Sequence, residues 1–403
     1  MTVAPFQHKS LLTIISVCHH RARTPKMKLL TPLQTFVLCT LISCVINCCN
    51  TERNEECRKK EGRMSRKFPI VQIFNKNTNK SINTFNDSSI QHLRSNITRA
   101  LIPYFFLLVF IIGLPANGLA LWILITRIKQ LPSTFLLINL ALADLFVILS
   151  LPWRIAYHLL GNNWLFGEVF CRISTAVLYG NVYSSILFLT CIGADRYLAI
   201  VHPFISKEIR NNTTAYCICG GVWLLLVLSM VPHYITKQSY WIDTLNITLC
   251  NDALPVQTLE TYHPYLICQV MFGFMIPCLI VVFCYISIIS SLFLNDMKYG
   301  HAIMATLLVL LVFLVCLTPF NMTLLIQVYT QSSDVYYYTM ICLAVSTFSN
   351  CIDPFIYYYI SEEFRNKLKS LIPAYKTETG SGKSDQSILQ SSSQSQPNPP
   401  LSE

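Results

Sequence analysis

The sequence is poor in charged residues, and this shortage excludes most soluble folds. Only 12% of the 403 residues are Asp, Glu, Lys or Arg, while 53% are hydrophobic. An ordinary soluble domain carries about 25% charged residues. Long apolar runs recur along most of the chain, and so little charge could not cover the surface of a soluble protein of this size. The composition therefore predicts a membrane protein.

The sequence also lacks the patterns typical of an enzyme, a metal centre or a nucleic-acid-binding protein. The 17 cysteines fall mostly inside apolar runs, where they behave as small hydrophobic residues, and no spacing favours zinc. No nucleophile–base pair and no cluster of metal ligands is apparent, so we predict neither a catalytic nor a metal site. The net charge of +10 comes from basic residues scattered through a tail and short loops, which argues against nucleic acid.

Seven apolar stretches are long enough to cross a bilayer. A hydrocarbon core of about 30 Å needs about 20 apolar residues in a helix. Several stretches contain proline, which packed membrane helices tolerate. They lie near residues 100–127, 135–160, 171–200, 216–237, 263–294, 301–329 and 336–360. We therefore predict an all-α membrane protein, a seven-transmembrane-helix bundle over residues 100–360.

The loops predict the orientation of the chain in the plasma membrane. Basic residues follow the first, third, fifth and seventh stretches, whereas the other loops carry acids, so the N-terminus is expected outside and the C-terminus inside. Residues 361–372 are expected to form a short amphipathic eighth helix on the membrane lipid, capped by Ser361, with Phe364, Leu368 and Leu371 on one face. Residues 373–403 are expected to be a disordered cytoplasmic tail. Its Ser and Thr are either phosphorylation sites or part of an inert solubilising segment.

The N-terminal hundred residues contain targeting and exported segments. Residues 1–50 are expected to be an N-terminal extension and a signal peptide, with Met27 as the probable start; a signal anchor is the alternative. Residues 51–99 are polar and basic, and we expect a disordered extracellular tail. Sequons predict glycosylation at Asn79, Asn86, Asn96 and Asn246.

The third stretch carries chemistry at both of its ends. Cys171 lies at one end and Asp195-Arg196-Tyr197 at the other. A helix would place Cys171 and Arg196 roughly 37 Å apart, slightly more than the hydrocarbon thickness. The cysteine is therefore expected in oxidising solvent and the arginine at the opposite interface.

With these and further motifs, the chain resembles the rhodopsin-like G-protein-coupled receptors over about residues 100–371. The further motifs are Ala116-Asn117-Gly118, Leu140-Ala141-Leu142-Ala143-Asp144, Trp223, Pro277 with Tyr285, Pro319, and Asp353-Pro354-Phe355-Ile356-Tyr357. The resemblance implies signalling through heterotrimeric G proteins. Cys171 and Cys250 are the exterior-facing cysteines best placed for a disulfide, which would tie the loop after the fourth stretch to the third.

The resemblance also implies roles for polar residues inside the bundle. Asp144 is a charge at membrane depth, which is costly and usually functional. In the family this acid helps to hold a structural sodium ion, and Asn117, Ser185, Asn350 and Asp353 are candidates to complete the site. The alternative is a purely structural hydrogen-bond network.

The activation switch is expected at the cytoplasmic interface. Arg196 should pair with Asp195 in the inactive state and be released on activation, beside Tyr285 and Tyr357. Leu317 stands before Pro319 where the family usually has Trp. We therefore expect Phe313 to carry the side-chain repacking.

The loop from Asn246 to Pro255 resembles the protease-activated receptors, with Asn251 where the family usually has His. Other stretches, such as Gly113 to Trp122, resemble the fourth subtype most. Members of this family carry their agonist in the N-terminal tail, where a serine protease unmasks it by cutting after a basic residue. We expect the cut after Arg66, with cleavage after Lys67 as the alternative. The tethered ligand would then read Lys67, Phe68, Pro69, Ile70, Val71, Gln72.

The new α-ammonium needs an acidic partner, and Asp252, next to Asn251, is our first choice. An apolar or aromatic slot for Phe68 is expected from Tyr179, Tyr157 or His158. Only Asp87 is acidic between Lys67 and Ser89, so a trypsin-like protease, or thrombin using its active site alone, fits better than docking on an acidic patch. The alternatives are a receptor for a diffusible lipid, nucleotide or peptide, and a transporter, which the absence of an internal repeat disfavours.

Overall fold

The structure is a computed structural model, and it describes residues 68–69, 71–75, 80–85, 87–254, 264–294, 300–330 and 333–371. Several predicted features lie outside the described residues. They are the signal peptide, the cut site at Arg66 and Lys67, Ile70, the sequons at Asn79 and Asn86, and the C-terminal tail.

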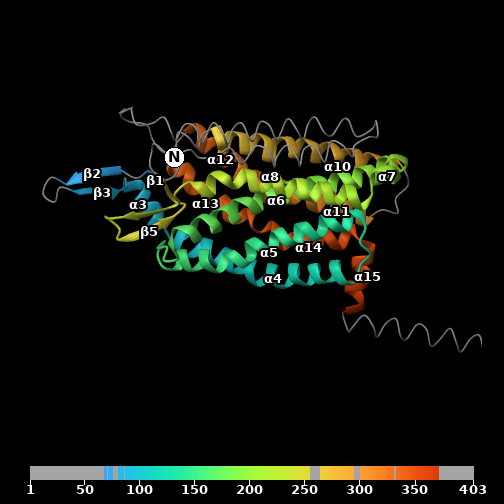
Figure 1. Cartoon of the computed structure of the whole chain (residues 1–403), viewed down its shortest axis with the longest axis horizontal. Coiled ribbons are helices and arrows are strands. Elements are labelled where there is room, and N and C mark those ends of the chain that lie inside the picture. Colours follow the sequence, from blue (N-terminus) through green and yellow to red (C-terminus); the bar gives the residue numbers. More distant parts are fainter. Residues whose placement is uncertain are drawn as a thin grey trace, which may run out of the picture.

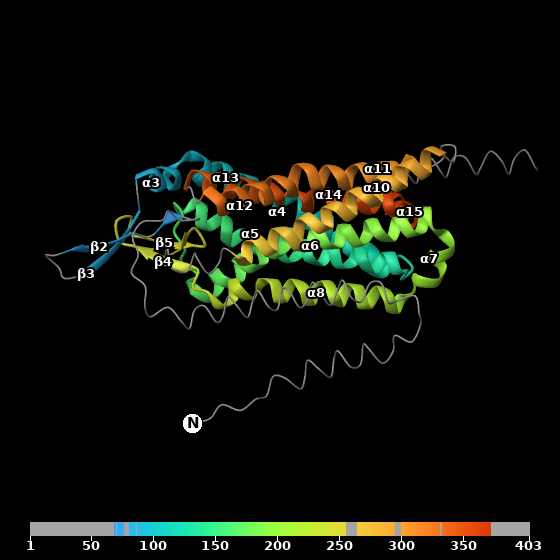
Figure 2. The same cartoon turned by 90° about the horizontal axis from the view of Figure 1, so that it is seen from above.

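Among the residues that the structure describes, seven long apolar helices lie side by side and form one bundle (Figures 1 and 2). This confirms the predicted fold class. The spans run over Ile97–Thr126, Pro132–Leu159, Gly167–Val201, Asn212–Ile235, Pro264–Ser291, Gly300–Gln327 and Asp334–Ile360. Their helical elements are η2 (Ile97–Leu101), α4 (Ile102–Thr126), α5 (Pro132–Leu159), α6 (Gly167–Val201), α8 (Asn212–Ile235), η3 (Met271–Met275), α10 (Ile276–Leu294), α11 (Gly300–Leu311), η4 (Val312–Leu317), α12 (Thr318–Thr330), α13 (Ser333–Ser346) and α14 (Ser349–Ile360).

Helix α6 is the core of the bundle. It packs against α5, α8 and α10, and 72% of its most apolar stretch is buried, against 28% for α8. Gly273 in η3 permits one close approach, because a Cβ there would lie 2.7 Å from the Tyr183 ring. Large apolar side chains such as Phe146, Phe283 and Leu314 are exposed on the outside of the bundle, where a bilayer would cover them.

Three of the described spans contain a π-helical turn, η2, η3 or η4, that the sequence did not predict. In η4 the backbone N–H of Thr318 bonds the carbonyl of Phe313, five residues earlier, and the Thr318 hydroxyl donates to the same carbonyl at 2.6 Å. The next residue, Pro319, has no N–H and interrupts the ladder in any case. Such turns are frequent at functional sites, and this one includes both Phe313 and Leu317.

Short strands gather at one end of the bundle, which we call the disulfide end (Figure 2). Strand β4 (Ser239–Ile242) pairs antiparallel with β5 (Ile247–Cys250), and β2 (Val71–Asn75) pairs antiparallel with β3 (Lys80–Thr84). Strand β1 (Phe68–Pro69) pairs parallel with β6 (Ala253–Leu254). Strand β1 also lies against α13, and β3 lies against β4.

These strands and helix α3 (Asp87–Arg94) correct the expectation of disorder for residues 51–99, as far as those residues are described. The physical reason is that part of this segment is buried against the bundle. Amino-acid composition does not predict such long-range contacts. Leu93 is 1% exposed, and the His92 ring stacks on Tyr337 of α13 with centroids 4.5 Å apart. His92 also pairs with Asp334 at 2.7 Å.

The opposite end, which we call the Arg196 end, carries two short helices, α7 (Pro203–Ile209) and α15 (Glu362–Leu371). The Phe364 N–H donates to the Ser361 hydroxyl at 3.2 Å, which confirms the predicted cap of the eighth helix. Phe364 is buried and Leu368 is partly buried against the bundle, while Leu371 is exposed.

Candidate functional site

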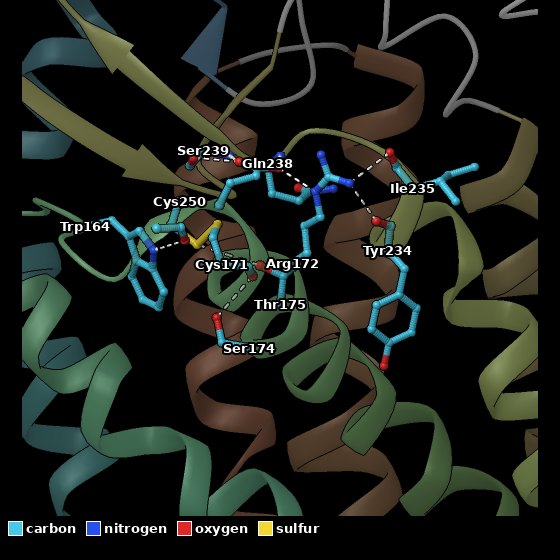
Figure 3. Close-up of polar contacts among 12 residues, drawn as sticks. Trp164, Cys171, Arg172, Ser174, Thr175, Tyr234, Ile235, Gln238, Ser239 and Cys250 are labelled. Carbon is cyan, nitrogen blue, oxygen red and sulfur yellow. Dashed lines mark hydrogen bonds and ion pairs between the residues drawn. A yellow bond between two sulfur atoms is a disulfide. The ribbon is translucent and has the colours of Figure 1, made fainter.

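At the disulfide end, the loop after α8 is fastened to the bundle by a covalent bond. Cys171, in the second turn of α6, and Cys250, at the end of β5, form a disulfide with a Cα–Cα distance of 5.7 Å (Figure 3). This is the pairing that we predicted. It fixes the position of the residues that follow Cys250.

An ion pair on α6 fastens the same loop at its start. The Glu168 carboxylate accepts from the backbone N–H groups of Gln238 and Ser239 at 2.9 and 2.7 Å, and from the Ser239 hydroxyl at 2.6 Å. Arg172, bonded to Glu168 at 2.5 Å, donates to the carbonyls of Tyr234 and Ile235 at the end of α8 (Figure 3). The two residues, here called the Glu168–Arg172 clamp, join α6, α8 and β4.

Asp252 follows the disulfide by two residues and points into the bundle. Its side chain is 4% exposed and accepts hydrogen bonds from the phenols of Tyr157 on α5 and Tyr336 on α13, the latter at 2.7 Å. Both donors are neutral, and no ion pair to Asp252 occurs among the residues that the structure describes. Neutral phenols are therefore the side chains that hold this carboxylate, and a cationic ligand would give it an ion-pair partner.

Arg154 brings a buried guanidinium to the same region. It donates to the Thr175 hydroxyl at 2.8 Å and to the Cys250 carbonyl at 3.4 Å, and it lies over the Trp164 ring at 5.7 Å. Its Nε has no hydrogen-bond partner in the described part of the chain. Arg154 thus links α5 and α6 to the disulfide loop.

A cavity of about 30 Å³ lies under Asp252. It brings together four of the five predicted pocket residues, Asp252, Asn251, Tyr179 and His158; the fifth, Tyr157, contacts it through its bond to Asp252. This volume holds little more than one water molecule, so the pocket is closed to a peptide in this conformation. Ligand entry therefore requires the disulfide loop or the ends of the helices to move.

Aromatic contacts lead from this cavity toward the middle of the bundle. Tyr179 packs edge-on against Phe320 with centroids 5.8 Å apart, and the Tyr183 hydroxyl donates to Asn321 at 3.4 Å. Phe320 and Asn321 directly follow Pro319 and η4, which contains the buried Phe313. The cavity is thus connected to the π-helical turn.

Five predicted residues form a buried polar cluster in the middle of the bundle. Asp144, Asp353, Asn117, Ser185 and Asn350 are each at most 1% exposed. The Asn117 amide donates to the Asn350 carbonyl at 2.7 Å, and Asn350 exchanges hydrogen bonds with Asn181 at 3.3 Å. Tyr357 donates to Asp144 at 3.5 Å.

The chemistry of this cluster fits a small cation. Within the described chain, five oxygens have no hydrogen-bond donor: Asn117 Oδ1, Asp144 Oδ1, Ser185 Oγ and both carboxylate oxygens of Asp353. Two acids interact here without a basic partner. Hard cations take oxygen ligands of this kind, and burying two uncompensated carboxylates is costly without one.

At the other end, Asp195 and Arg196 form the predicted ion pair at 3.2 Å. A cavity of about 300 Å³ opens beside Arg196, lined among others by Tyr285, His301, Tyr359 and Arg365. Tyr357 is fully buried beside Asp144 instead of lining this cavity. In this conformation, therefore, only one of the two predicted tyrosines lies beside Arg196.

The described sequons differ in their surroundings. Asn246 is exposed in the turn between β4 and β5, in the left-handed region with φ 55°, which Asn tolerates. Asn96 is exposed, but the Thr98 hydroxyl of its sequon is buried, with the carbonyl oxygens of His92, Leu93 and Ser95 as acceptors within 3.1 Å for its one proton. Glycosylation at both sites stays a prediction.

Sequence reasoning missed four polar residues: Tyr336, Arg154, Asn181 and Arg210. Arg154 and Asn181 carried a usable signal, because each is a polar residue inside an apolar span. Tyr336 is one of three consecutive tyrosines, with exposures of 2%, 8% and 58% for Tyr336, Tyr337 and Tyr338, and only packing distinguishes them. Arg210 looked like an ordinary loop cation.

The bundle, the disulfide and the Asp195–Arg196 pair define the class of protein. Residues 116–357 match the family model described as 7 transmembrane receptor (rhodopsin family), so the chain is a multi-pass membrane receptor of that family and not an enzyme or a transporter.

Similar proteins of known name indicate to which group of rhodopsin-family receptors the chain belongs. The chain is 40% identical to proteinase-activated receptor 3 of Homo sapiens over 284 residues, covering 68% of this chain and 75% of the relative. It is 42% identical to proteinase-activated receptor 4 of Mus musculus over 278 residues, covering 68% and 70%. It is 33% identical to proteinase-activated receptor 2 of Mus musculus over 356 residues, covering 83% and 87%. The chain belongs to the proteinase-activated receptors, and these similar identities do not separate the fourth subtype from the third.

Proposed function

We propose that the chain is a G-protein-coupled receptor that a serine protease activates by cutting its N-terminal tail after Arg66. The new N-terminus, Lys67-Phe68-Pro69-Ile70-Val71-Gln72, acts as a tethered ligand at the disulfide end of the bundle. This end faces the cell exterior and the Arg196 end faces the cytoplasm, in the plasma membrane. A trypsin-like protease, or thrombin acting through its active site alone, makes the cut.

One observation carries the proposal: the ligand segment lies against the loop that holds Asp252. Strand β1 pairs in parallel with β6, with Phe68 opposite Ala253 and Pro69 opposite Leu254. Ala253 directly follows Asp252, so the pairing sets Phe68 beside the residue next to the acid. Addition of a strand to an exposed edge is a common way to bind an extended peptide.

Cleavage after Arg66 creates an α-ammonium one residue before Phe68. Asp252 supplies the matching carboxylate, held by the phenols of Tyr157 and Tyr336. The cut therefore adds a positive charge to a segment that the loop already holds. A salt link inside a closed pocket is worth more than one in water, since both charges lose their solvent screening. Covalent tethering raises the effective ligand concentration to about millimolar, so the segment itself needs little affinity.

The signal passes from the ligand pocket to Arg196 through packed side chains. Tyr179 lines the cavity and contacts Phe320, which follows η4 and Pro319. A shift of Tyr179 repacks Phe313, moves α11 and widens the cavity beside Arg196 and Tyr285. Arg196 then leaves Asp195, and the cavity binds a heterotrimeric G protein. Receptor kinases and arrestin act on the tail beyond residue 372.

The polar cluster around Asp144 holds a sodium ion in the inactive state. The oxygens without donors on Asn117, Asp144, Ser185 and Asp353 would coordinate it, and Asn350 orients Asn117 through its carbonyl. The ion would neutralise the two buried acids. A purely structural hydrogen-bond network leaves these oxygens without partners, which favours the ion.

Cells expressing the receptor test the cut site directly. Trypsin or thrombin is added and intracellular calcium is recorded for wild type and for Arg66→Ala, with Arg63→Ala as the matched control. We expect Arg66→Ala to lose at least tenfold in protease potency, while Arg63→Ala responds as wild type, because only the first change removes the residue that the protease recognises.

The synthetic amide Lys-Phe-Pro-Ile-Val-Gln should activate the uncut Arg66→Ala receptor, since it replaces the missing ligand. Equal protease responses in wild type and Arg66→Ala would show that the cut lies elsewhere. A receptor for a diffusible lipid, nucleotide or peptide would respond to neither the protease nor this hexapeptide.

A further inference from the structure

The carboxylate of Asp195 binds two arginines, and Arg196 is the weaker bound. Arg210 donates to it through two nitrogens, Nε at 2.6 Å to Oδ1 and a terminal nitrogen at 3.3 Å to Oδ2. Arg196 reaches only Oδ2, at 3.2 Å. A two-point fork of this kind is among the strongest side-chain contacts to a carboxylate.

The loop after α6 is built to direct Arg210 back to Asp195. Helix α7 begins at Pro203 and ends where the Arg210 N–H bonds the Ser206 carbonyl at 2.9 Å. The next residue, Asn211, caps α8 by accepting from the Thr214 N–H at 2.8 Å. Arg210 is therefore held between two helix ends, and its side chain is only 27% exposed.

The same geometry decides what happens when Arg196 leaves. The Asp195 side chain is 10% exposed, so losing its only cationic partner would leave a nearly buried carboxylate without compensation. With Arg210 in place the charge stays paired. The two guanidinium groups bind the same carboxylate, so their like charges repel each other. Arg210 therefore favours the release of Arg196 in three ways: it competes for the Asp195 carboxylate, it keeps that carboxylate paired afterwards, and it repels the Arg196 guanidinium.

We propose that Arg210 is a positioning residue that holds the Asp195 carboxylate in competition with Arg196 and so lowers the cost of activation. From the loop after α6, Arg210 thus determines how much stimulus is needed to release Arg196 from Asp195. The inference rests on the rhodopsin-family switch and does not depend on the position of the protease cut.

The test is a double-mutant cycle in purified, full-length receptor reconstituted with a heterotrimeric G protein in lipid vesicles. Nucleotide exchange is measured without a stimulus and over a range of trypsin concentrations. The variants are Arg210→Gln, Asp195→Asn, the double variant and Arg210→Lys. Lys207→Gln is the control, since Lys207 is an exposed cation on α7, three residues before Arg210.

We expect Arg210→Gln to lower exchange roughly threefold to tenfold and to shift the trypsin response to higher concentration. Asp195→Asn raises unstimulated exchange, because it frees Arg196. Adding Arg210→Gln to Asp195→Asn changes nothing further, since the carboxylate for which the arginines compete is gone. Arg210→Lys falls between wild type and Arg210→Gln, because lysine keeps the charge and loses the fork. Lys207→Gln behaves as wild type.

Two results would overturn the proposal. If Arg210→Gln lowers exchange equally in the Asp195→Asn background, Arg210 acts by contacting the G protein or by holding α7. If Arg210→Gln raises unstimulated exchange, it restrains the receptor instead. Trypsin could fail to raise nucleotide exchange in the wild type while the unstimulated exchange of the variants follows the expectations above. In that case the proposal of protease activation fails and the proposal for Arg210 stands.

Discussion

Single buried polar residues carry most of the chemistry that we assign to this receptor. Asp252 is almost fully buried, yet its hydrogen bonds come from two neutral phenols. Tyr157 and Tyr336 hold the carboxyl group through hydrogen bonds and form no ion pair with it. Removing the charge should therefore affect a cationic ligand far more than it affects the fold.

Replacement of Asp252 with Asn tests this at the scale of one side chain. We expect the potency of the Lys-Phe-Pro-Ile-Val-Gln amide to fall by about tenfold to a hundredfold, because a hydrogen bond to a charged group is worth about 1.5–3 kcal/mol. The calcium response measures the change, with Asp243→Asn, an exposed acid in the same loop, as the matched control. An unchanged potency at normal surface expression would exclude Asp252 as the ammonium partner.

Among the elements, α6 organises both ends of the molecule. At the disulfide end it supplies Cys171 and the Glu168–Arg172 clamp, and at the other end it supplies Asp195 and Arg196. The clamp holds β4 and the end of α8 against α6 through neutral backbone groups as well as an ion pair. The loop that presents Asp252 therefore depends on α6 for its position.

Arg172→Gln should loosen this loop. The carbonyls of Tyr234 and Ile235 lose their charged donor, and partly solvated bonds of this kind contribute about 0.5–1.5 kcal/mol each. We expect a melting temperature several degrees lower in a thermal-unfolding assay of purified receptor, together with weaker hexapeptide potency. The control is Arg127→Gln, which removes a cation stacked on Trp122 at the Arg196 end and leaves the clamp intact. Equal melting temperatures for wild type and Arg172→Gln would mean that the disulfide alone positions the loop.

On the scale of the whole molecule, the core between the two ends contains a pair of buried acids. Asp144 and Asp353 lie between the ligand cavity and the Arg196 cavity, and Tyr357 is bonded to Asp144. A cation bound there stabilises the arrangement in which Tyr357 stays away from Arg196. Such an ion would therefore couple folding stability to the choice between inactive and active states.

Sodium should raise the melting temperature of the purified receptor, whereas choline at the same ionic strength should not. The reason is that a ligand bound only by the folded state stabilises it by mass action. Asp144→Asn should abolish the sodium effect, and Asp243→Asn should retain it. A wild type that melts at the same temperature in both salts would contradict the proposed ion site.

The sequence predicted the bundle and much of the site, for reasons that can be named. Seven spans follow from apolar length alone, and Asp195 and Arg196 are neighbours in the chain, so their pairing needs no long-range information. Disorder in residues 51–99 was wrong for the described part, because α3 packs on α13 through His92, which stacks on Tyr337 and bonds Asp334. Those contacts join residues more than two hundred positions apart.

The sequence by itself determined which segments are long and apolar enough to cross the membrane and where the charges lie along each span. These properties are local: they depend on runs of side chains and on the length of a helix. The tertiary structure alone decided that Tyr336 rather than Tyr338 faces Asp252, that Arg210 returns to Asp195 and that β1 lies on β6. A span that is apolar on every side does not reveal which face meets its neighbours, because packing between helices sets that rotation.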